Sequence, residues 1–308
     1  MALATVRDRE YRHRMPTYNY LHLDVFTSTP FEGNQLAVFP NPEGLNDPMM
    51  QTIAREMNFS ESTFIFPPER GGNVRMRIFT PGSELPIAGH PTIGSTFALA
   101  HEGAITSDMT DFVFELGVGP TPVSLTWGRE GLEFAWMTQP LPVFSPPVED
   151  RAALAAALGV ESADLMPGLP AQTISCGVPF FFAALKSREA VDRVQVDARA
   201  LKRCAAGATE VFVFTTEGPE TAYSRMLAPS LGVAEDPATG AASGPLGCYL
   251  LQHAVVSPDV ARAMISLQGV AMKRPSRVHI SIDSEGGSIT RVRVGGQSVF
   301  VGRGELSV

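Results

Sequence analysis

The sequence predicts an α+β protein of two similar domains, each a mostly antiparallel sheet rolled around one buried helix. One pattern occurs twice, at residues 77–95 and 225–241: a strand, a loop, a polar residue before proline, and a helix of small residues. The helix in each copy is apolar on all faces, so it needs a surface around it, and a curled sheet supplies one. Strands are expected on both sides of each helix, which indicates an internal duplication. The groove between duplicated domains is a common place for a small-molecule site.

Composition limits the possible partners. The chain has 308 residues and a formal net charge of −8. The negative charge argues against nucleic acid and anionic membranes as partners, and no apolar run reaches membrane-spanning length. The three cysteines are widely spaced and form no zinc or redox motif, which favours a reduced, cytoplasmic setting. Residues 1–17 lack the apolar core of a secretory signal. They are expected to be a flexible tail, and the alternative is an oligomer contact.

The first half is expected to form a domain at 18–138. A helix is expected at 47–57, where Asp47 is the candidate cap and Pro48 takes the first position. The buried helix follows from 91 to about 101. Apolar and β-branched runs bounded by turn residues predict strands at 20–26, 35–39, 63–66, 74–79, 112–116, 122–127 and 132–137.

The second half is expected to form a domain at 139–308, after a proline-rich linker at 139–147. Its last strand, about 296–308, is a candidate to return to the first domain. Helices are expected at 148–158, 197–206 and 241–253, the last being the second buried helix. Strands are expected at 180–185, 210–215, 222–227, 262–267, 278–282, 288–294 and 298–301.

The repeated proline predicts where both buried helices begin. Proline suits the first helical position, and the residue before it is then the cap. His90 and Asp236 are therefore expected at the mouths of two helices whose free N–H groups point outward. Two such mouths facing each other across a cleft would hold an anionic substrate. The alternative is structural, because capping alone explains an Asp-Pro sequence at a helix start.

Glu61 is the candidate base. It lies between a helix and a strand and is flanked by Phe59, Phe64 and Phe66. A carboxylate in an apolar pocket has a raised pKa, and a base works best when its pKa is near the working pH. One such group can remove a proton and return it on the same face of a substrate. The alternative is an exposed turn residue, since Ser-Glu-Ser is also turn chemistry.

Four segments resemble the PhzF-like family, the phenazine-biosynthesis isomerases, from about residue 18 to the C-terminus. This family belongs with the diaminopimelate epimerases, whose fold is two similar domains, each a sheet rolled around a helix. The resemblance implies a cofactor-independent isomerase, a homodimer, a catalytic role for Glu61, and partner roles for His90 and Asp236. The segments are GNQLAVF at 33–39, FSESTFIF at 59–66, FTPGSELPIAGHPTIGS at 79–95 and EDPATGAASGPLGCYL at 235–250.

The resemblance also implies substrate-binding positions at the two helix mouths and beside Glu61. They are Ser60, Gly89, Gly240, Ala241 and Ser243. The family usually has serine at position 241, whose hydroxyl is expected to contact the substrate or the catalytic carboxylate. Ala241 therefore suggests a secondary-metabolism relative with its own substrate. Ser243, two positions further along, is the candidate to compensate.

The main hypothesis is an isomerase that moves a proton within a small unsaturated metabolite, expected to be carboxylated and anionic. One alternative is an epimerase or racemase of an amino-acid derivative, with Glu61 and His90 or Asp236 in place of thiols. The thiol pair of the epimerases is missing, because neither helix mouth carries cysteine. A second alternative is a ligand-binding protein on the same fold without turnover. The other histidines show no ligand spacing, so no metal is expected.

Overall fold

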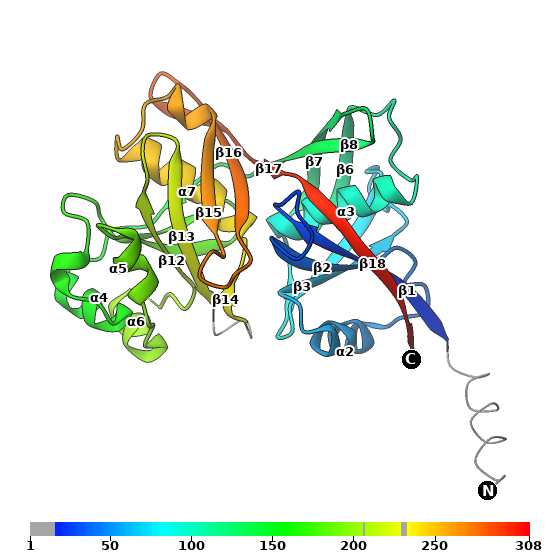
Figure 1. Ribbon diagram of the computed structural model, residues 1–308, viewed down its shortest axis with the longest axis horizontal. Helices are drawn as coiled ribbons and strands as arrows, with labels where there is room; N and C mark the ends of the chain where they lie inside the picture. Colours follow the sequence, from blue (N-terminus) through cyan, green and yellow to red (C-terminus); the bar gives the residue numbers. More distant parts are fainter. Residues whose placement is uncertain (1–15, 206, 229–232) are drawn as a thin grey trace, which may run out of the picture.

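The computed structural model describes residues 16–205, 207–228 and 233–308. Figure 1 shows two lobes side by side, with helix α3 inside one and helix α7 inside the other. The structure is mixed α+β, and its described strands join into one connected sheet system. The prediction of two sheets, each wrapped around a buried helix, is confirmed. The division of the sequence between residues 138 and 139 stays a prediction.

The first lobe combines antiparallel hairpins with two parallel pairings. β2 runs parallel to β3, and β4 runs parallel to β6, while its other strand pairs are antiparallel. Its elements are β1 (Thr17–Val25), β2 (Asn34–Phe39), α2 (Asp47–Met57), β3 (Glu61–Phe66), β4 (Val74–Phe79), β5 (Glu84–Leu85), α3 (Gly89–His101), β6 (Asp111–Leu116), β7 (Gly119–Trp127) and β8 (Leu132–Gln139).

The second lobe repeats this plan. β11 runs parallel to β12, and β13 runs parallel to β15, as in the first lobe. Its elements are β9 (Val143–Phe144), α4 (Arg151–Leu158), η1 (Ser162–Asp164), β10 (Gln172–Ser175), β11 (Pro179–Ala184), α5 (Arg188–Arg193), α6 (Ala198–Cys204), β12 (Val211–Thr216), β13 (Thr221–Ala228), β14 (Val233–Asp236), α7 (Gly240–Gln252), η3 (Val260–Arg262), β15 (Met264–Gln268), β16 (Ser276–Glu285) and β17 (Ser288–Gly296). The last strand, β18 (Ser298–Ser307), lies in the first lobe.

An ion pair is duplicated together with the strands. In the first lobe Arg77 on β4 pairs with Glu84 on β5, with Nη2 2.7 Å from Oε2. In the second lobe Arg225 on β13 pairs with Glu235 on β14, also at 2.7 Å. Each pair ties a short strand to the long strand before it, and each buried helix begins a few residues later. The internal duplication predicted from the sequence therefore extends to side-chain contacts.

Two strands connect the lobes at the end of the chain. β17 pairs with β16 in the second lobe and with β8 in the first. β18 then pairs antiparallel with β1 along its whole length, which places the C-terminus beside the first strand (Figure 1). Since β17 bonds to both sheets, the two lobes share backbone hydrogen bonds as well as side-chain contacts.

The predicted helix caps are wrong in all three cases. Asn46, not Asp47, caps α2 by accepting the N–H of Met49. Ala88 precedes α3, so His90 lies within its first turn, and Thr239 precedes α7. Asp236 is the last residue of β14. The physical reason is that the first N–H groups of a helix have no intrahelical partner, so proline fits any position in the first turn or just outside it.

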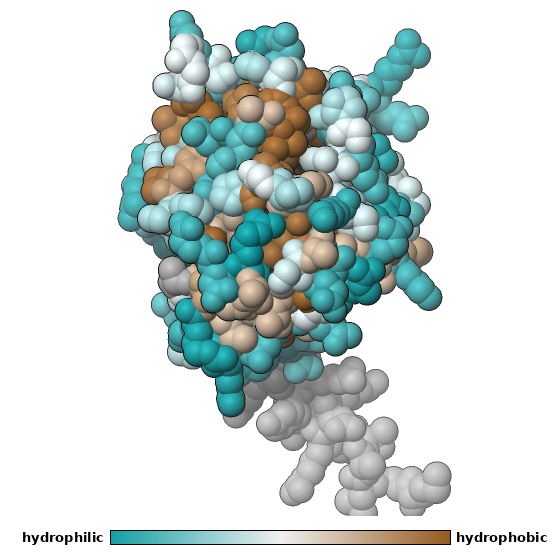
Figure 2. All heavy atoms as spheres, turned by 90° about the vertical axis from the view of Figure 1, so that its left-hand side faces the viewer, coloured by the Kyte–Doolittle hydropathy of each residue, from teal (hydrophilic) through white to brown (hydrophobic). Residues whose placement is uncertain are grey.

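The outer face of the second lobe carries both hydrophilic and apolar residues. Figure 2 looks onto the second lobe and shows apolar residues gathered in the upper part of this face, with hydrophilic residues over most of the rest. Large exposed apolar side chains within the described ranges are few: Phe31, Val118, Leu141 and Val143. No helix in those ranges is both long enough and apolar enough to cross a bilayer.

Candidate active site

A cavity of about 160 Å³ lies where the two lobes meet. Residues from both halves of the chain form its wall, and most of them are apolar. The polar contribution comes from the start of β3, the first turns of α3 and α7, and Glu210. The lining residues are Glu61, Leu85, Ile87, Ala88, Gly89, His90, Val178, Pro179, Phe180, Glu210, Met226, Thr239, Gly240 and Ala241.

The N-termini of α3 and α7 meet at this cavity. A Cβ atom on Gly89 would come within 2.5 Å of the Cα atom of Gly240, so glycine is needed for this approach. Neither cap residue, Ala88 or Thr239, makes a side-chain hydrogen bond to its helix. The two helices therefore present uncapped N–H groups and positive dipole ends to the same space. The prediction of two facing helix mouths is confirmed.

Glu61 is the carboxyl group of the cavity. It is the first residue of β3, which is placed by its parallel pairing with β2, where Leu36 lies opposite Glu61. Its side chain is 13% exposed, and Oε2 has no hydrogen-bond partner among the described residues. Burial raises the pKa of Glu61 well above its ordinary value, and the negative charge of Asp236 raises it further. This environment favours the neutral acid and makes the ionised form a strong base.

His90 lies beside Glu61, with its Nδ1 atom 3.3 Å from Glu61 Oε2. The imidazole is 3% exposed, and its Nε2 atom has no hydrogen-bond partner in the described part of the chain. Burial lowers the pKa of His90 to about 3, although the backbone of Gln35 acts in the opposite direction. The ring is therefore neutral at ordinary pH, and it can exchange hydrogen bonds without adding charge to the cavity.

Asp236 is held in a network of hydrogen bonds and does not line the cavity. Its Oδ1 atom accepts a bond from Asn34 Nδ2 at 2.8 Å, and Oδ2 accepts one from the hydroxyl of Thr239. Burial raises the pKa of Asp236, while the hydrogen bonds from Ser60, Thr239 and Asn34 act to lower it. The side chain of Gln268 donates to the backbone carbonyl of Asp236 at 2.7 Å. Asp236 is thus connected to His90 through Asn34, and it also bonds to Ser60, the residue before Glu61.

The expected substrate-binding residues fall into two groups. Gly89, Gly240 and Ala241 line the cavity, while Ser60 and Ser243 do not. The hydroxyl of Ser60 bonds to Asp236. Ser243 is fully buried and donates to the carbonyl of Thr239 at 2.9 Å, within its own helix. Its hydroxyl therefore does not take the place of the serine that Ala241 replaces.

Sequence reasoning missed two amides that organise the site. Asn34 contacts Asp236, His90 and the carbonyl of Ala238, and Gln268 contacts Asp236 and Thr239. Asn34 had a signal, because it lies inside the GNQLAVF segment that contributes to the family resemblance. Gln268 had none, since a single glutamine at the end of a strand is ordinary.

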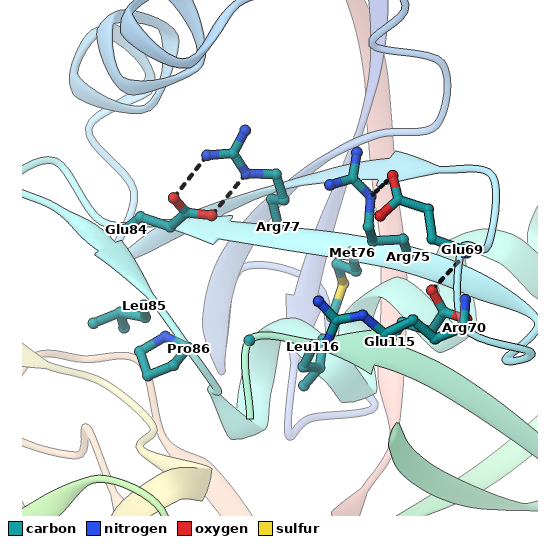
Figure 3. A pocket seen from close by; sticks show the side chains of 11 residues that line it. Glu69, Arg70, Arg75, Met76, Arg77, Glu84, Leu85, Pro86, Glu115 and Leu116 are labelled. Atoms are coloured by element: carbon teal, nitrogen blue, oxygen red, sulfur yellow. Dashed lines mark hydrogen bonds and ion pairs between the residues drawn. The ribbon is translucent and has the colours of Figure 1, made fainter. Parts of the chain in front are cut away.

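A larger pocket of about 420 Å³ lies next to the cavity, and Leu85 lines both. Figure 3 shows that charged side chains from β4 and its neighbours form it. Arg77 pairs with Glu84, and Arg75 lies 3.3 Å from Glu69. Glu115 accepts the backbone N–H groups of Glu69, Arg70 and Gly72. The carboxylates that line this larger pocket already have partners, whereas Glu61 Oε2 in the smaller cavity has none among the described residues. The smaller cavity is therefore the candidate active site.

Known proteins resemble this chain over nearly its whole length. A family model described as phenazine biosynthesis-like protein matches residues 23–304. The trans-2,3-dihydro-3-hydroxyanthranilate isomerase of Pseudomonas fluorescens is 37% identical over 296 residues, which are 94% of this chain and 99% of the relative. An uncharacterized isomerase of Mesorhizobium japonicum is 36% identical, and the match covers 96% of this chain and all of the relative.

Solved structures show the same relationship. A Bacillus anthracis phenazine biosynthesis protein of the PhzF family superposes with a TM-score of 0.84 at 26% identity, covering 96% of this chain and all of the other. A probable proline racemase of Agrobacterium radiobacter, with a TM-score of 0.66 and 13% identity over 94% of this chain and 93% of the other, shares the fold. The chain therefore belongs to the PhzF family of phenazine biosynthesis-like proteins, and it is an isomerase of this type.

Proposed function

We propose that the protein is a cofactor-independent isomerase that moves a proton between two carbons of a small unsaturated, carboxylated metabolite. The observation that supports this most directly is the pair formed by Glu61 and His90. A carboxyl group that is 13% exposed lies 3.3 Å from a neutral imidazole, in a cavity bordered by two uncapped helix N-termini. General acid–base catalysis needs such a group within hydrogen-bond reach of the reacting atoms.

The helix N-termini provide the binding part of the proposal. Uncapped N–H groups and the positive ends of two helix dipoles attract a carboxylate. In the cavity they come from Gly89 on α3 and from Gly240 and Ala241 on α7. Apolar walls, including Ile87, Phe180 and Met226, would pack against the carbon skeleton. A carboxylate bound here would place the adjacent carbons in the same small space as Glu61.

Glu61 would carry the proton. In its ionised form it removes a proton from one carbon, and the electron pair that is left spreads over the neighbouring double bond. The resulting carboxylic acid then returns the proton to the carbon at the other end of this system. The product is an isomer of the substrate, and Glu61 ends ionised, as it began. A raised pKa supports both steps, because it strengthens the base and stabilises the acid that follows.

The first substrate to test is the one named for the relatives, trans-2,3-dihydro-3-hydroxyanthranilate. Turnover would be followed by NMR in D₂O for the wild-type protein, Glu61→Gln, and Glu69→Gln as a control from the neighbouring pocket. We expect the double-bond isomer to form with the wild type and the control, and its formation to fall about 100-fold or more with Glu61→Gln. Deuterium enters at the new carbon whenever the protonated Glu61 exchanges with D₂O before it returns the proton. Unchanged turnover in Glu61→Gln would refute the proposal.

The same experiment separates the alternatives. Deuterium at a stereocentre, with the double bond in place, would identify an epimerase that uses Glu61 with His90 or Asp236. None of the three cysteines lines the cavity, which argues against the two-thiol form of that reaction. Thermal stabilisation by the compound without any exchange would identify a binding protein.

Two further properties belong to the same proposal. We expect a homodimer, which the family resemblance implies, and a cytoplasmic location, which the unpaired cysteines favour. Sedimentation of the purified chain would measure the oligomeric state.

A further inference from the structure

Asn34 lies between two of the candidate catalytic residues. It is the first residue of β2 and is 1% exposed. Its side-chain nitrogen, Nδ2, is 2.8 Å from Asp236 Oδ1, 2.9 Å from the carbonyl of Ala238 and 3.2 Å from His90 Nδ1. One amide group thus joins residues that are 56 and more than 200 positions away along the chain.

The orientation of this amide follows from its neighbours. Asp236 Oδ1 and the carbonyl of Ala238 can only accept hydrogen bonds, so the nitrogen must face them. Turning the amide over would bring its own oxygen against two other oxygens. The amide NH₂ has two hydrogens, and these two acceptors are its closest partners. Hydrogen-bond chemistry therefore fixes which atom of the amide is the nitrogen.

This orientation restricts His90. An amide nitrogen donates hydrogen bonds but does not accept them, so a proton on His90 Nδ1 could not be given to Asn34. It would instead face the positive hydrogens of the NH₂ group. Glu61 Oε2 is 3.3 Å from Nδ1 but makes no hydrogen bond in the described part of the chain, and the backbone of Gln35 is the other acceptor near the ring. Asn34 therefore opposes a proton on Nδ1, and Glu61 and Gln35 are the acceptors that compete for one.

We propose that Asn34 is a positioning residue that holds His90 in the tautomer with its proton on Nε2. This inference rests on the proposed function, since it assigns His90 a direction in the same reaction. The Nε2–H group has no partner among the described residues, and His90 lines the cavity, so the substrate supplies the acceptor. His90 then donates to an oxygen or nitrogen of the substrate while its Nδ1 atom faces Glu61.

The backbone around Asn34 is held from the other lobe. The carbonyl of Gly33 accepts from Arg274 Nε at 2.8 Å, and its N–H donates to the carbonyl of Pro275 at 3.2 Å. Arg274 is fixed in turn by Asp24. Because the residue before Asn34 is bonded on both sides, the amide has little freedom to turn away from Asp236 and His90. This rigidity is what a residue that sets a tautomer needs.

The test is the NMR spectrum of the protein labelled with ¹⁵N-histidine. One-bond and long-range couplings identify which ring nitrogen carries the proton, and His90→Gln identifies the signals of His90. We expect neutral His90 in the wild type, with its proton on Nε2. A wild-type ring with its proton on Nδ1, given to Glu61 or to the carbonyl of Gln35, would overturn the proposal. This NMR measurement uses the wild-type protein, so it does not depend on the folding of a variant at Asn34, and it does not require a substrate.

Two variants extend the test. Asn34→Asp replaces the NH₂ group with an oxygen, which faces Nδ1 and also Asp236 Oδ1 and the carbonyl of Ala238. We expect the proton to move to Nδ1 and kcat to fall about 10- to 100-fold with little change in KM, in a variant whose thermal unfolding shows that it is folded. Gln268→Leu is the matched control, because Gln268 supports Asp236 and Thr239 without contacting His90. We expect its His90 signals to keep the wild-type tautomer. If His90 keeps its proton on Nε2 in Asn34→Asp, the role of Asn34 is contradicted. If wild-type His90 has its proton on Nε2 but the wild-type protein does not turn over the substrate, only the proposed isomerase reaction is contradicted.

Discussion

Gly89 and Gly240 bring the two halves of the molecule into backbone contact. A Cβ atom on Gly89 would lie 2.5 Å from Gly240 Cα, and one on Gly240 would lie 2.9 Å from Gly89 Cα. Both glycines are at the starts of the buried helices, 151 positions apart in the sequence. Their contact decides how far apart the two helix mouths are, and therefore the width of the cavity between them.

The first prediction concerns this contact. We expect Gly89→Ala to push the helix starts apart, to lower the free energy of unfolding by about 1–3 kcal/mol and to reduce activity. Gly302→Ala is the control, because a Cβ there meets nothing within 4 Å. Chemical denaturation and turnover would be measured for both variants. Wild-type stability and activity in Gly89→Ala would show that the helix mouths can separate without consequence.

The second prediction concerns the pH dependence of stability at Glu61. Burial raises the pKa of Glu61 in the folded state above its value in the unfolded chain. Its contribution to stability is therefore present at low pH and is lost as the pH rises through the folded-state pKa. Glu61→Gln removes this loss. We expect the Tm of the variant, relative to wild type, to increase between pH 5 and pH 9, by roughly 2–4 °C for each kcal/mol.

Thermal unfolding of both proteins in matched buffers would measure this difference. The other buried carboxyl of the site, Asp236, is present in both proteins, so the difference between them reports Glu61 together with its charge interaction with Asp236. A constant difference in Tm across the pH range would contradict a raised pKa at Glu61, whatever the activity of the variant.

The third prediction concerns Ala241, which lines the cavity in the first turn of α7. We expect Ala241→Ser to restore a hydroxyl beside the substrate and to raise kcat/KM for trans-2,3-dihydro-3-hydroxyanthranilate about tenfold, because one placed donor is worth at least this much in such a site. Ala242→Ser is the control, since Ala242 is fully buried and does not line the cavity. A fall in kcat/KM with Ala241→Ser would indicate a substrate that needs the smaller side chain.

The residues with local signals were those that the sequence could identify. The two buried helices are apolar on all sides, so they could be recognised in the sequence without knowledge of their tertiary contacts. Glu61 stood out because phenylalanines surround it in the sequence, and His90 because it precedes the proline in one repeat as Asp236 does in the other. β10 and β14 were not expected, because each has only four residues and lacks a clear alternation.

The contacts that hold the site together depend on distant pairings. Asn34 meets Asp236 across 202 positions, and Arg274 meets Asp24 across 250. Within its own segment of the sequence, each of these four residues looks like an ordinary polar side chain. The helix caps failed for a related reason: a proline restricts its own φ, but it does not determine which residue begins the helix. The positions of Ala88 and Thr239 follow from the contact between the two helix starts.

The last prediction concerns the ion pair between Asp24 and Arg274, which joins the lobes beneath Asn34. Asp24 is 1% exposed, and Arg274 Nη2 also donates to the carbonyl of Glu32 at 2.8 Å. Arg274→Met leaves a buried carboxylate without its charged partner, so we expect the free energy of unfolding to fall by about 3–5 kcal/mol. Asp24→Asn in the same chain removes the unpaired charge, so the double variant should regain part of this loss. Urea unfolding of the two single variants and the double variant forms a double-mutant cycle that measures the coupling directly. The guanidinium of Arg274 also donates to the carbonyl of Gly33, next to Asn34. We therefore expect Arg274→Met to reduce kcat even in the double variant. Full activity in the double variant would show that Asn34 keeps its position without the bond from Arg274 to Gly33.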